Sequence, residues 1–206
     1  MTDDSTPDQN LWKPRSLEET KTLYANWAEN YDADVTEWGY ATPPRVAMAL
    51  RRAGANVDKA VLDYGCGTGL SGMALRGVGF DVIDGTDISP DMLARAEARG
   101  CYRQVWLGEP GTLGHIGLGD YAAIVATSVV SLGAAPPETL ALLIEALAPG
   151  NLLAFSYNDA TLADRSYTDA LDVACLAPDI ELVFEEHGPH LPAKDINATV
   201  YVLQRT

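Results

Sequence analysis

Apolar residues recur along the chain with two alternating spacings, one typical of strands and one typical of helices. Short apolar runs bounded by glycine, proline or polar residues predict seven strands, at 60–64, 80–86, 103–107, 121–127, 151–157, 180–187 and 197–204. Helical spacing predicts helices at about 70–77, 90–99, 137–147 and 160–175. This alternation predicts a doubly wound α/β fold, in which helices cover both faces of a mainly parallel sheet.

The two ends of the chain depart from this alternation. The last two predicted strands are joined by HGPHLPAKD with no helix between them, so we expect them to pair antiparallel at the edge of the sheet. Residues 1–15 are polar and contain two prolines, which predicts a flexible tail. A capping box at Ser16 and Glu19 begins one helix, and Pro43 and Pro44 begin a second that ends at Gly54. We therefore predict a single domain over residues 16–206, with a helical region at 16–55.

The charge of the chain argues against nucleic-acid binding. Its 206 residues include 14 Lys+Arg and 29 Asp+Glu, which gives a formal net charge of −15. Phosphate recognition depends on Lys and Arg, whereas residues 104–206 contain 13 acidic residues and three basic ones. We therefore expect the protein to repel polyanions.

No segment of the sequence predicts export or membrane insertion. The first ten residues lack the apolar segment of a signal peptide. The longest uncharged run, 121–137, has 17 residues and is interrupted by glycine and two prolines, so it is too short to span a bilayer. Three unclustered cysteines, Cys66, Cys101 and Cys175, suit a reducing compartment. We expect a cytoplasmic protein with no membrane partner and leave its oligomeric state open.

The segment VLDYGCGTGLSG, residues 61–72, carries the strongest indication of a ligand site. Gly65, Gly67 and Gly69 form a tight turn between a predicted strand and a predicted helix. Glycine is required where a ligand must approach the backbone closely or where φ is positive. Asp87 ends the next strand, where its carboxylate can accept hydrogen bonds from both hydroxyls of a ribose.

Two interpretations of this loop compete. Gly67, Gly69 and Gly72 also satisfy the dinucleotide pattern G-x-G-x-x-G, with Asp87 following Gly67 by 20 residues, so an NAD(P)-dependent oxidoreductase is one alternative. Asp63, two residues before the first glycine, separates the two. Its carboxylate would repel a diphosphate and would stabilise a nearby ammonium or sulfonium group.

These residues resemble the class I S-adenosylmethionine-dependent methyltransferases. VLDYGCGTG matches their first motif, hydrophobic-x-D-x-G-x-G-x-G, at every defined position. TDISPDML is similar to their second cofactor segment, which implies that Asp87 binds the ribose and that Ile88 and Met92 pack on the adenine. LGEP follows the third predicted strand, where the resemblance implies that Glu109 binds the adenine amino group.

The N-terminal segment YANWAENYDADV is similar to the start of small-molecule methyltransferases and to the methyltransferase-like group named after the Williams-Beuren region. The resemblance implies that the region 16–55 is a helical lid over the methyl-donor pocket. It also implies a seven-stranded, mostly parallel sheet with an antiparallel C-terminal strand, S-adenosylmethionine as cofactor and a small-molecule acceptor. The cofactor-binding residues that it implies are Tyr24, Trp27, Tyr31, Asp63, Gly65, Cys66, Gly67, Thr68, Gly69, Asp87, Ile88, Met92, Glu109 and Thr127.

The acceptor and any catalytic side chain stay open at this point. The segment VATSVVSL after the fourth strand lacks the Pro-Pro-aromatic motif of enzymes that methylate base amino groups, which again disfavours nucleic acid. A small metabolite or a basic peptide remains. Methyl transfer needs a base only for a hydroxyl, a carbon acid or a protonated amine. The candidates for that base are Asp32, Asp34, Glu37, His187 and His190.

One further expectation concerns metal binding, and one concerns catalysis. His187 and His190 lie three residues apart, but a metal would need more ligands at suitable spacing, so we predict no metal site. A non-catalytic protein with the same fold, acting as a partner or regulator, is a second alternative to the methyltransferase.

Overall fold

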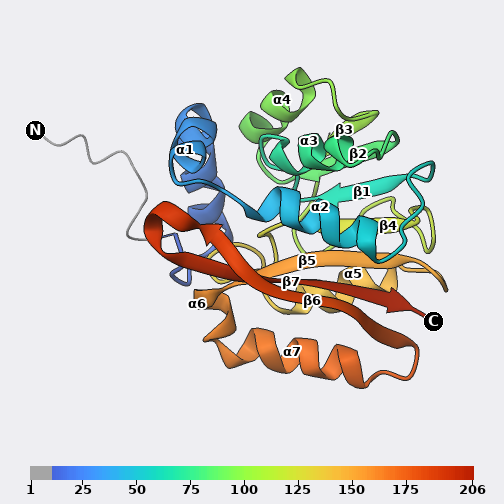
Figure 1. Cartoon of the computed structure of the whole chain (residues 1–206). Helices are drawn as coiled ribbons and strands as arrows, with labels where there is room; N and C mark the ends of the chain where they lie inside the picture. The colour runs from blue at the N-terminus through green and yellow to red at the C-terminus, as the bar shows by residue number, and fades with distance from the viewer. Residues whose placement is uncertain (1–10) are drawn as a thin grey trace, which may run out of the picture.

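A seven-stranded sheet in the order β3-β2-β1-β4-β5-β7-β6 forms the centre of the computed structural model (Figure 1). The structure describes residues 11–206. β1 to β5 pair in parallel, and β7 runs antiparallel to both β5 and β6, which confirms the predicted fold class. The strands are β1 (Val61–Tyr64), β2 (Ile83–Asp87), β3 (Gln104–Leu107), β4 (Ala123–Ala126), β5 (Leu152–Asn158), β6 (Ile180–Leu191) and β7 (Ile196–Arg205).

Helices cover both faces of this sheet. They are α1 (Leu17–Glu37), α2 (Thr42–Arg52), α3 (Leu70–Gly77), α4 (Pro90–Ala98), α5 (Glu138–Glu145), α6 (Asp159–Leu162) and α7 (Arg165–Leu176), with a short 3₁₀ helix η1 (Pro192–Lys194). Consecutive residues of a strand face opposite sides, so each strand supplies two cores. Val61 packs with residues of α2 and α3, and Leu62 packs with residues of α5 and α7.

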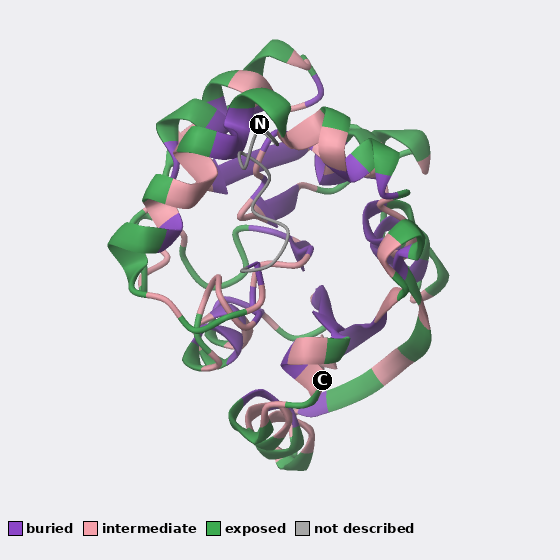
Figure 2. Ribbon diagram, turned by 90° about the vertical axis from the view of Figure 1, so that its left-hand side faces the viewer, coloured by how far each residue is buried: buried purple, intermediate pink, exposed green. Residues whose placement is uncertain are grey.

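Burial follows this layered arrangement. Figure 2 shows buried residues on the strands and on the inward sides of the helices, with exposed residues on the outer helical surfaces. Among residues 11–206, no helix is both long and apolar enough to cross a bilayer.

Most predicted element boundaries are confirmed within a few residues, and the differences have local causes. The capping box at Ser16 is present. The helix predicted over 160–175 is two helices, because Asn158 caps α6 and Asp164 caps α7 by accepting a backbone N–H each. Most of the predicted connection HGPHLPAKD belongs to β6, which continues to Leu191 through two register shifts.

The predicted tail, residues 1–15, lies partly outside the described residues. Residues 11–15 are described, and Leu11 is 8% exposed. Leu11 and Trp12 join the apolar cluster that Trp27 and Trp38 form with neighbouring residues. Because this pair has apolar surface to bury, the segment packs against the rest of the protein instead of projecting from it.

Candidate active site

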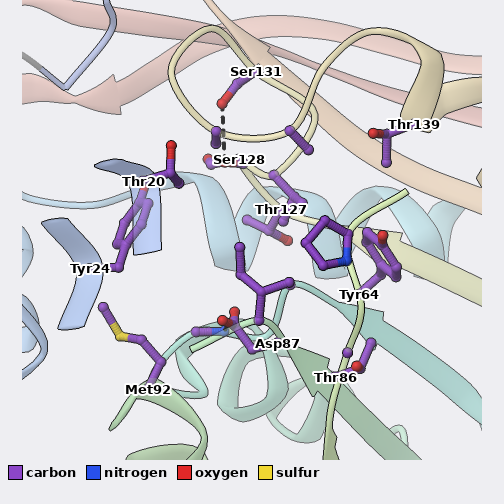
Figure 3. Close-up of a pocket in the computed structure, with 18 of the residues that line it drawn as sticks. Thr20, Tyr24, Tyr64, Thr86, Asp87, Met92, Thr127, Ser128, Ser131 and Thr139 are labelled. Carbon is purple, nitrogen blue, oxygen red and sulfur yellow. Dashed lines mark hydrogen bonds between the residues drawn. The ribbon is translucent and has the colours of Figure 1, made fainter. Parts of the chain in front are cut away.

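A cavity of about 460 Å³ lies at the carboxyl edge of the sheet, between the strand ends and α1. The parallel strands β1, β2 and β4 all end at this edge, so the loops that follow them line the cavity. Figure 3 shows Asp87 and Met92 on one side, Ser128 and Ser131 on the other, and Thr127 between them. The cavity therefore joins residues from β2 and α4 to residues of the loop after β4.

The glycine loop gives the cavity its floor. Gly65, Gly67 and Gly69 have φ values of +70°, +54° and +91°. The backbone N–H groups of Gly65 and Cys66 donate to Thr86 O at 2.8 and 2.9 Å, which ties the loop to β2. A Cβ at position 65 would lie 2.4 Å from Val129, whereas a Cβ at position 67 would meet no atom within 4 Å. Gly67 thus faces open space that a ligand can occupy.

Asp87 lies at the end of β2 with its carboxylate against this loop. It accepts hydrogen bonds from the backbone N–H of Gly67 and of Ser89, both at 2.9 Å. Burial raises the pKa of Asp87, and these backbone hydrogen bonds oppose the increase. Because a carboxylate offers about four lone pairs, Asp87 can still accept a hydrogen bond from a hydroxyl of a ribose.

Asp63 lies beneath the loop and lines neither the main cavity nor a smaller one beside it. It is fully buried, and its Oδ2 accepts hydrogen bonds from Ser71 at 2.6 Å and from the Tyr102 hydroxyl at 2.7 Å. Burial raises the pKa of Asp63 to about 6, against these two hydrogen bonds. Its second oxygen, Oδ1, is buried without a hydrogen-bond partner among the described residues, and its charge lies beneath the glycine loop.

Of the fourteen cofactor-binding residues predicted from the sequence, ten line the main cavity. Cys66 and Thr68 line the adjoining cavity of about 40 Å³. Gly69 packs against α4, where a Cβ would lie 3.2 Å from the Ala96 backbone. The ten residues that line the main cavity are Tyr24, Trp27, Tyr31, Gly65, Gly67, Asp87, Ile88, Met92, Glu109 and Thr127.

The aromatic residues of α1 form a roof over the cavity. The ring centroids of Trp27 and Tyr31 lie 4.7 Å apart, and the Trp27 indole donates to Asp34 at 2.6 Å. Asp32 ties α1 to the body of the protein, because it accepts a hydrogen bond from Thr68 Oγ1 at 2.6 Å and forms an ion pair with Arg99. The predicted lid thus rests directly on the glycine loop.

Only one of the five candidate bases, all of which lie in the described part of the chain, lines the main cavity. That residue is His190, which is 5% exposed. Asp32 and Asp34 are engaged in the roof, Glu37 is exposed, and the ring of His187 is hydrogen bonded to Thr199 at 3.0 Å. The geometry therefore selects His190 from a set that the sequence left open.

Sequence reasoning missed several polar residues around His190. The Tyr40 hydroxyl donates to Ser128 Oγ at 3.0 Å, and Ser156 Oγ accepts from the Ser128 backbone N–H at 3.0 Å. Thr42 Oγ1 and His190 Nδ1 lie 2.7 Å apart. Tyr40, Thr42 and Ser156 are far apart in the sequence and belong to no local motif, whereas Ser128 directly follows a predicted strand end, a position that the sequence does indicate as a wall of the site.

Comparison with known proteins identifies the family of the chain that forms this cavity. Residues 38–200 match the methyltransferase domain family. The chain belongs to this family. The assignment confirms the resemblance to class I S-adenosylmethionine-dependent methyltransferases, gives the chain S-adenosylmethionine as its cofactor and decides against the NAD(P)-dependent oxidoreductase.

Individual relatives agree with this assignment. Human methyltransferase-like protein 27 is 32% identical over 156 residues, which cover 73% of this chain and 62% of that protein, so the chain spans less than two thirds of the relative. The ribosomal protein L11 methyltransferase of Thiobacillus denitrificans is 30% identical over 93 residues, or 43% of this chain and 30% of that enzyme. The solved structure of the [4+2]-cyclase SpnF superposes with a TM-score of 0.70 at 13% identity, over 94% of this chain and 98% of that one, which shows a shared fold.

The residues of the methyltransferase cavity fit S-adenosylmethionine. Among the described residues that line it, Asp87 and Glu109 are acidic and none is a lysine or an arginine. Thr127 Oγ1 is buried there without a hydrogen-bond partner, as expected of a group that meets a ligand. Two carboxylates suit the hydroxyl and amino donors of an adenosine that carries a positively charged sulfur, whereas a diphosphate would find no cationic side chain.

Proposed function

We propose that this methyltransferase acts on a small-molecule acceptor inside the roofed cavity. The observation that carries the proposal is the closure of the cavity by α1 and by residues 11–17. Thr20 Oγ1 of α1 donates to Gly133 O at 3.4 Å, and Leu11, Trp12 and Leu17 line the cavity from above. Its volume of about 460 Å³ lies in the range of small-molecule sites, about 300 to 1,000 Å³.

The sheet side of the cavity supplies the residues that would hold the cofactor. Asp87 would bind the ribose, Ile88 and Met92 would pack on the adenine, and Glu109 would bind the adenine amino group. Gly67 leaves room for the amino-acid portion. When bound, S-adenosylmethionine supplies a methyl group on a positively charged sulfur. The protein contributes alignment and exclusion of water, which together lower the barrier by up to about 7 to 11 kcal/mol in favourable cases.

A protein acceptor is the main competitor, because one relative is named as a methyltransferase of a ribosomal protein. The net charge of −15 would attract a basic peptide and would repel RNA. Because residues 11–17 and α1 cover one side of the cavity, the roof favours a free small molecule over a side chain on a protein surface. We assign the reaction to the cytoplasm, where the unpaired cysteines Cys66, Cys101 and Cys175 would stay reduced.

Two measurements test the proposal. The first is calorimetry with S-adenosylhomocysteine, which we expect to bind in the micromolar range. The second incubates the full chain with methyl-labelled S-adenosylmethionine and a cell extract, then separates the dialysable fraction from protein and RNA. Label in a dialysable product that separates from S-adenosylmethionine by chromatography and is absent without the enzyme supports a small-molecule acceptor, and label in protein or RNA alone overturns it. Binding without transfer to any fraction would instead support the non-catalytic alternative.

A further inference from the structure

A group of connected polar side chains occupies the part of the cavity farthest from Asp87 along the sheet. Within this group, the Tyr40 hydroxyl is hydrogen bonded to Ser128. The Tyr40 ring also meets the His190 ring edge-on, with centroids 5.3 Å apart. His190 is held in turn by Thr42. Tyr40, Ser128 and His190 all line the cavity.

The fold brings His190 to this place from the far edge of the sheet. β6 is antiparallel to β7, and β7 is antiparallel to β5, so β6 ends at the same edge as the parallel strands. A register shift between Pro189 and Leu191 lies at this end of β6. The backbone N–H of Ala41 donates to His190 O at 2.9 Å, which fixes the strand end against the start of α2. His190 is therefore rigidly placed on the side of the cavity that the cofactor residues leave free.

The cavity wall beside His190 is largely apolar apart from this polar group, and the nearby charged residues Arg45 and Asp159 do not line the cavity. Val35, Trp38 and Leu191 are buried members of one hydrophobic cluster and also line the cavity. Asp87 and Glu109, the two acidic lining residues of the described chain, belong to the cofactor side. An anionic acceptor would meet no lysine or arginine among the described lining residues, and a cationic one would meet no lining carboxylate on this side of the cavity.

We propose that the acceptor is an uncharged aromatic molecule with a hydroxyl group, and that His190 is the catalytic residue that accepts the hydroxyl proton. The inference rests on the proposed function and deepens it by naming the acceptor class. Tyr40 and Ser128 lie beside His190 and orient the hydroxyl oxygen by hydrogen bonding. The walls that Trp38 and Leu191 form pack against the apolar ring.

The chemistry of the step balances with groups that are present. The acceptor oxygen forms a bond to the methyl carbon while the bond from that carbon to sulfur breaks, and the electron pair stays on sulfur as a neutral thioether. The hydroxyl proton passes to Nε2 of His190 and then to water after the product leaves. This assignment uses the tautomer in which Nδ1–H donates to Thr42 Oγ1, 2.7 Å away. Among the described residues, Nε2 has no hydrogen-bond partner that would compete for its lone pair.

The protonation state of His190 suits this role. The pKa of His190 is lowered to about 4, mainly by burial, while Asp159 opposes the decrease and Arg45 adds to it. The imidazole is therefore neutral near pH 7 and free to accept a proton. Such a weak base cannot ionise a hydroxyl in advance. It can accept the proton as the new bond forms, because the oxygen then becomes strongly acidic.

A binding experiment tests the acceptor class without catalysis. The full chain saturated with S-adenosylhomocysteine is titrated with 2-naphthol, 2-naphthoate or 2-naphthylmethylammonium in a calorimeter. We expect 2-naphthol to bind at least about tenfold more tightly than either charged probe, a difference of about 1.4 kcal/mol. Equal binding of the three, or preference for a charged one, overturns the proposal.

A kinetic experiment tests the role of His190 with two probes of the same shape. 2-Naphthol must lose a proton during transfer, whereas 2-naphthalenethiol is already ionised at mildly alkaline pH and needs no base. We expect His190→Gln to lower kcat for 2-naphthol by roughly 100-fold and to change kcat for the thiol by less than about threefold. His187→Gln is the matched control, because His187 lies on the same strand but does not line the cavity. It should leave both rates unchanged.

The remaining outcomes of the binding and kinetic experiments also distinguish the proposals. An equal loss with both probes in His190→Gln would show a structural role and would overturn the proposal. Thr42→Val keeps the imidazole but removes its Nδ1 partner, so it should lower the 2-naphthol rate selectively even if His190→Gln does not fold. If S-adenosylhomocysteine binds and no hydroxyl probe is methylated, the acceptor class is wrong and the proposed function stands. If S-adenosylhomocysteine does not bind, the proposed function itself fails.

Discussion

The two halves of the cavity are built in different ways. In the cofactor half, the backbone N–H of Gly67 meets Asp87 across 20 residues, and the parallel pairing of β1 with β2 fixes this contact. In the acceptor half, Tyr40 meets Ser128 across 88 residues and Thr42 meets His190 across 148. One half rests on the backbone of adjacent strands, and the other on side chains brought together by the whole fold. Substitutions in the first half should therefore remove cofactor binding, and substitutions in the second should alter the acceptor or the roof.

The sharpest test of the cofactor half is Gly67→Val. Its side chain would enter the open space above the glycine loop, so we expect affinity for S-adenosylhomocysteine to fall by at least about 100-fold, near 3 kcal/mol. Gly100→Val is the matched control. Gly100 also has a positive φ, +64° compared with +54° for Gly67, and a Cβ there meets no atom within 4 Å. Both variants should lose about 1 to 3 kcal/mol of stability from backbone strain.

Calorimetry and urea unfolding of the two variants check this prediction. Affinity should fall only in Gly67→Val, because position 100 is remote from the cavity lining. If Gly67→Val kept its affinity, or if both variants lost it equally, the close approach of a ligand to Gly67 would be refuted.

The second prediction compares one buried titratable group from each half. The pKa of His190 is lowered from 6.5 to about 4, so unfolding takes up a proton between these pH values. Stability from this group is therefore present at neutral pH and lost as the pH falls to about 4, by about 3 kcal/mol. The pKa of Asp63 is raised from 3.8 to about 6, so this carboxyl destabilises the fold at neutral pH. Between about pH 6 and pH 3.8 the Asp63 carboxyl is protonated in the folded state and ionised in the unfolded state. The free energy of unfolding therefore rises by a similar amount as the pH falls through this range.

The contributions of His190 and Asp63 to stability change in opposite directions with pH, so they partly cancel in the wild-type protein. Substituting one residue at a time should reveal each contribution. As the pH falls from about 7 to about 4, the wild-type protein should lose about 3 kcal/mol of stability relative to His190→Gln. Over the same range it should gain about 3 kcal/mol relative to Asp63→Asn. Urea unfolding at several pH values measures both differences. Two changes of the same sign would show that burial does not control these groups as described.

The third prediction returns to the cofactor half. Asp87→Ala removes a charged acceptor, so affinity for S-adenosylhomocysteine should weaken by about 1.5 to 3 kcal/mol, the usual range for hydrogen bonds to charged groups. The variant also frees the backbone N–H groups of Gly67 and Ser89, so thermal unfolding must accompany the calorimetry. Asp91→Ala, an exposed aspartate in the first turn of α4, is the control and should bind normally. An unchanged dissociation constant in Asp87→Ala would refute its role at the ribose.

The same difference between the halves explains what the sequence could predict. The capping box at Ser16, the strands and the glycine loop are local patterns, so they were identified from neighbouring residues alone. The sequence predicts that Asp63 binds the ligand, and in the structure its side chain lines neither cavity. It shares a strand face with Val61, which packs on α2 and α3, so alternation along β1 directs it to Ser71 of α3. Because alternation along a strand is a local pattern, the sequence does encode this orientation of Asp63.

The acceptor half offered no comparable pattern. Tyr40 follows the end of α1, and His190 lies in a segment rich in glycine and proline that the sequence suggested was a connection. Both reach the cavity because β6 continues past its predicted end and because α1 turns back over the strand ends. Such positions depend on tertiary packing and on register shifts, which local periodicity does not encode.

The smallest expected effect concerns the roof, where the two halves meet. Asp32 joins α1 to Thr68 in the glycine loop and to Arg99 after α4. Because the pair is partly exposed, Asp32→Asn should cost the fold about 1 kcal/mol or less. Loosening the roof should nevertheless speed release of S-adenosylhomocysteine by roughly threefold to fivefold, since about 1 kcal/mol corresponds to a factor of this size. Stopped-flow tryptophan fluorescence would follow the release, because all four tryptophans line the cavity, and Glu29→Gln, exposed on the same helix, is the control. If both variants released the ligand at the wild-type rate, α1 would cover the cavity without retaining the cofactor, and the division into a rigid floor and a movable roof would be wrong.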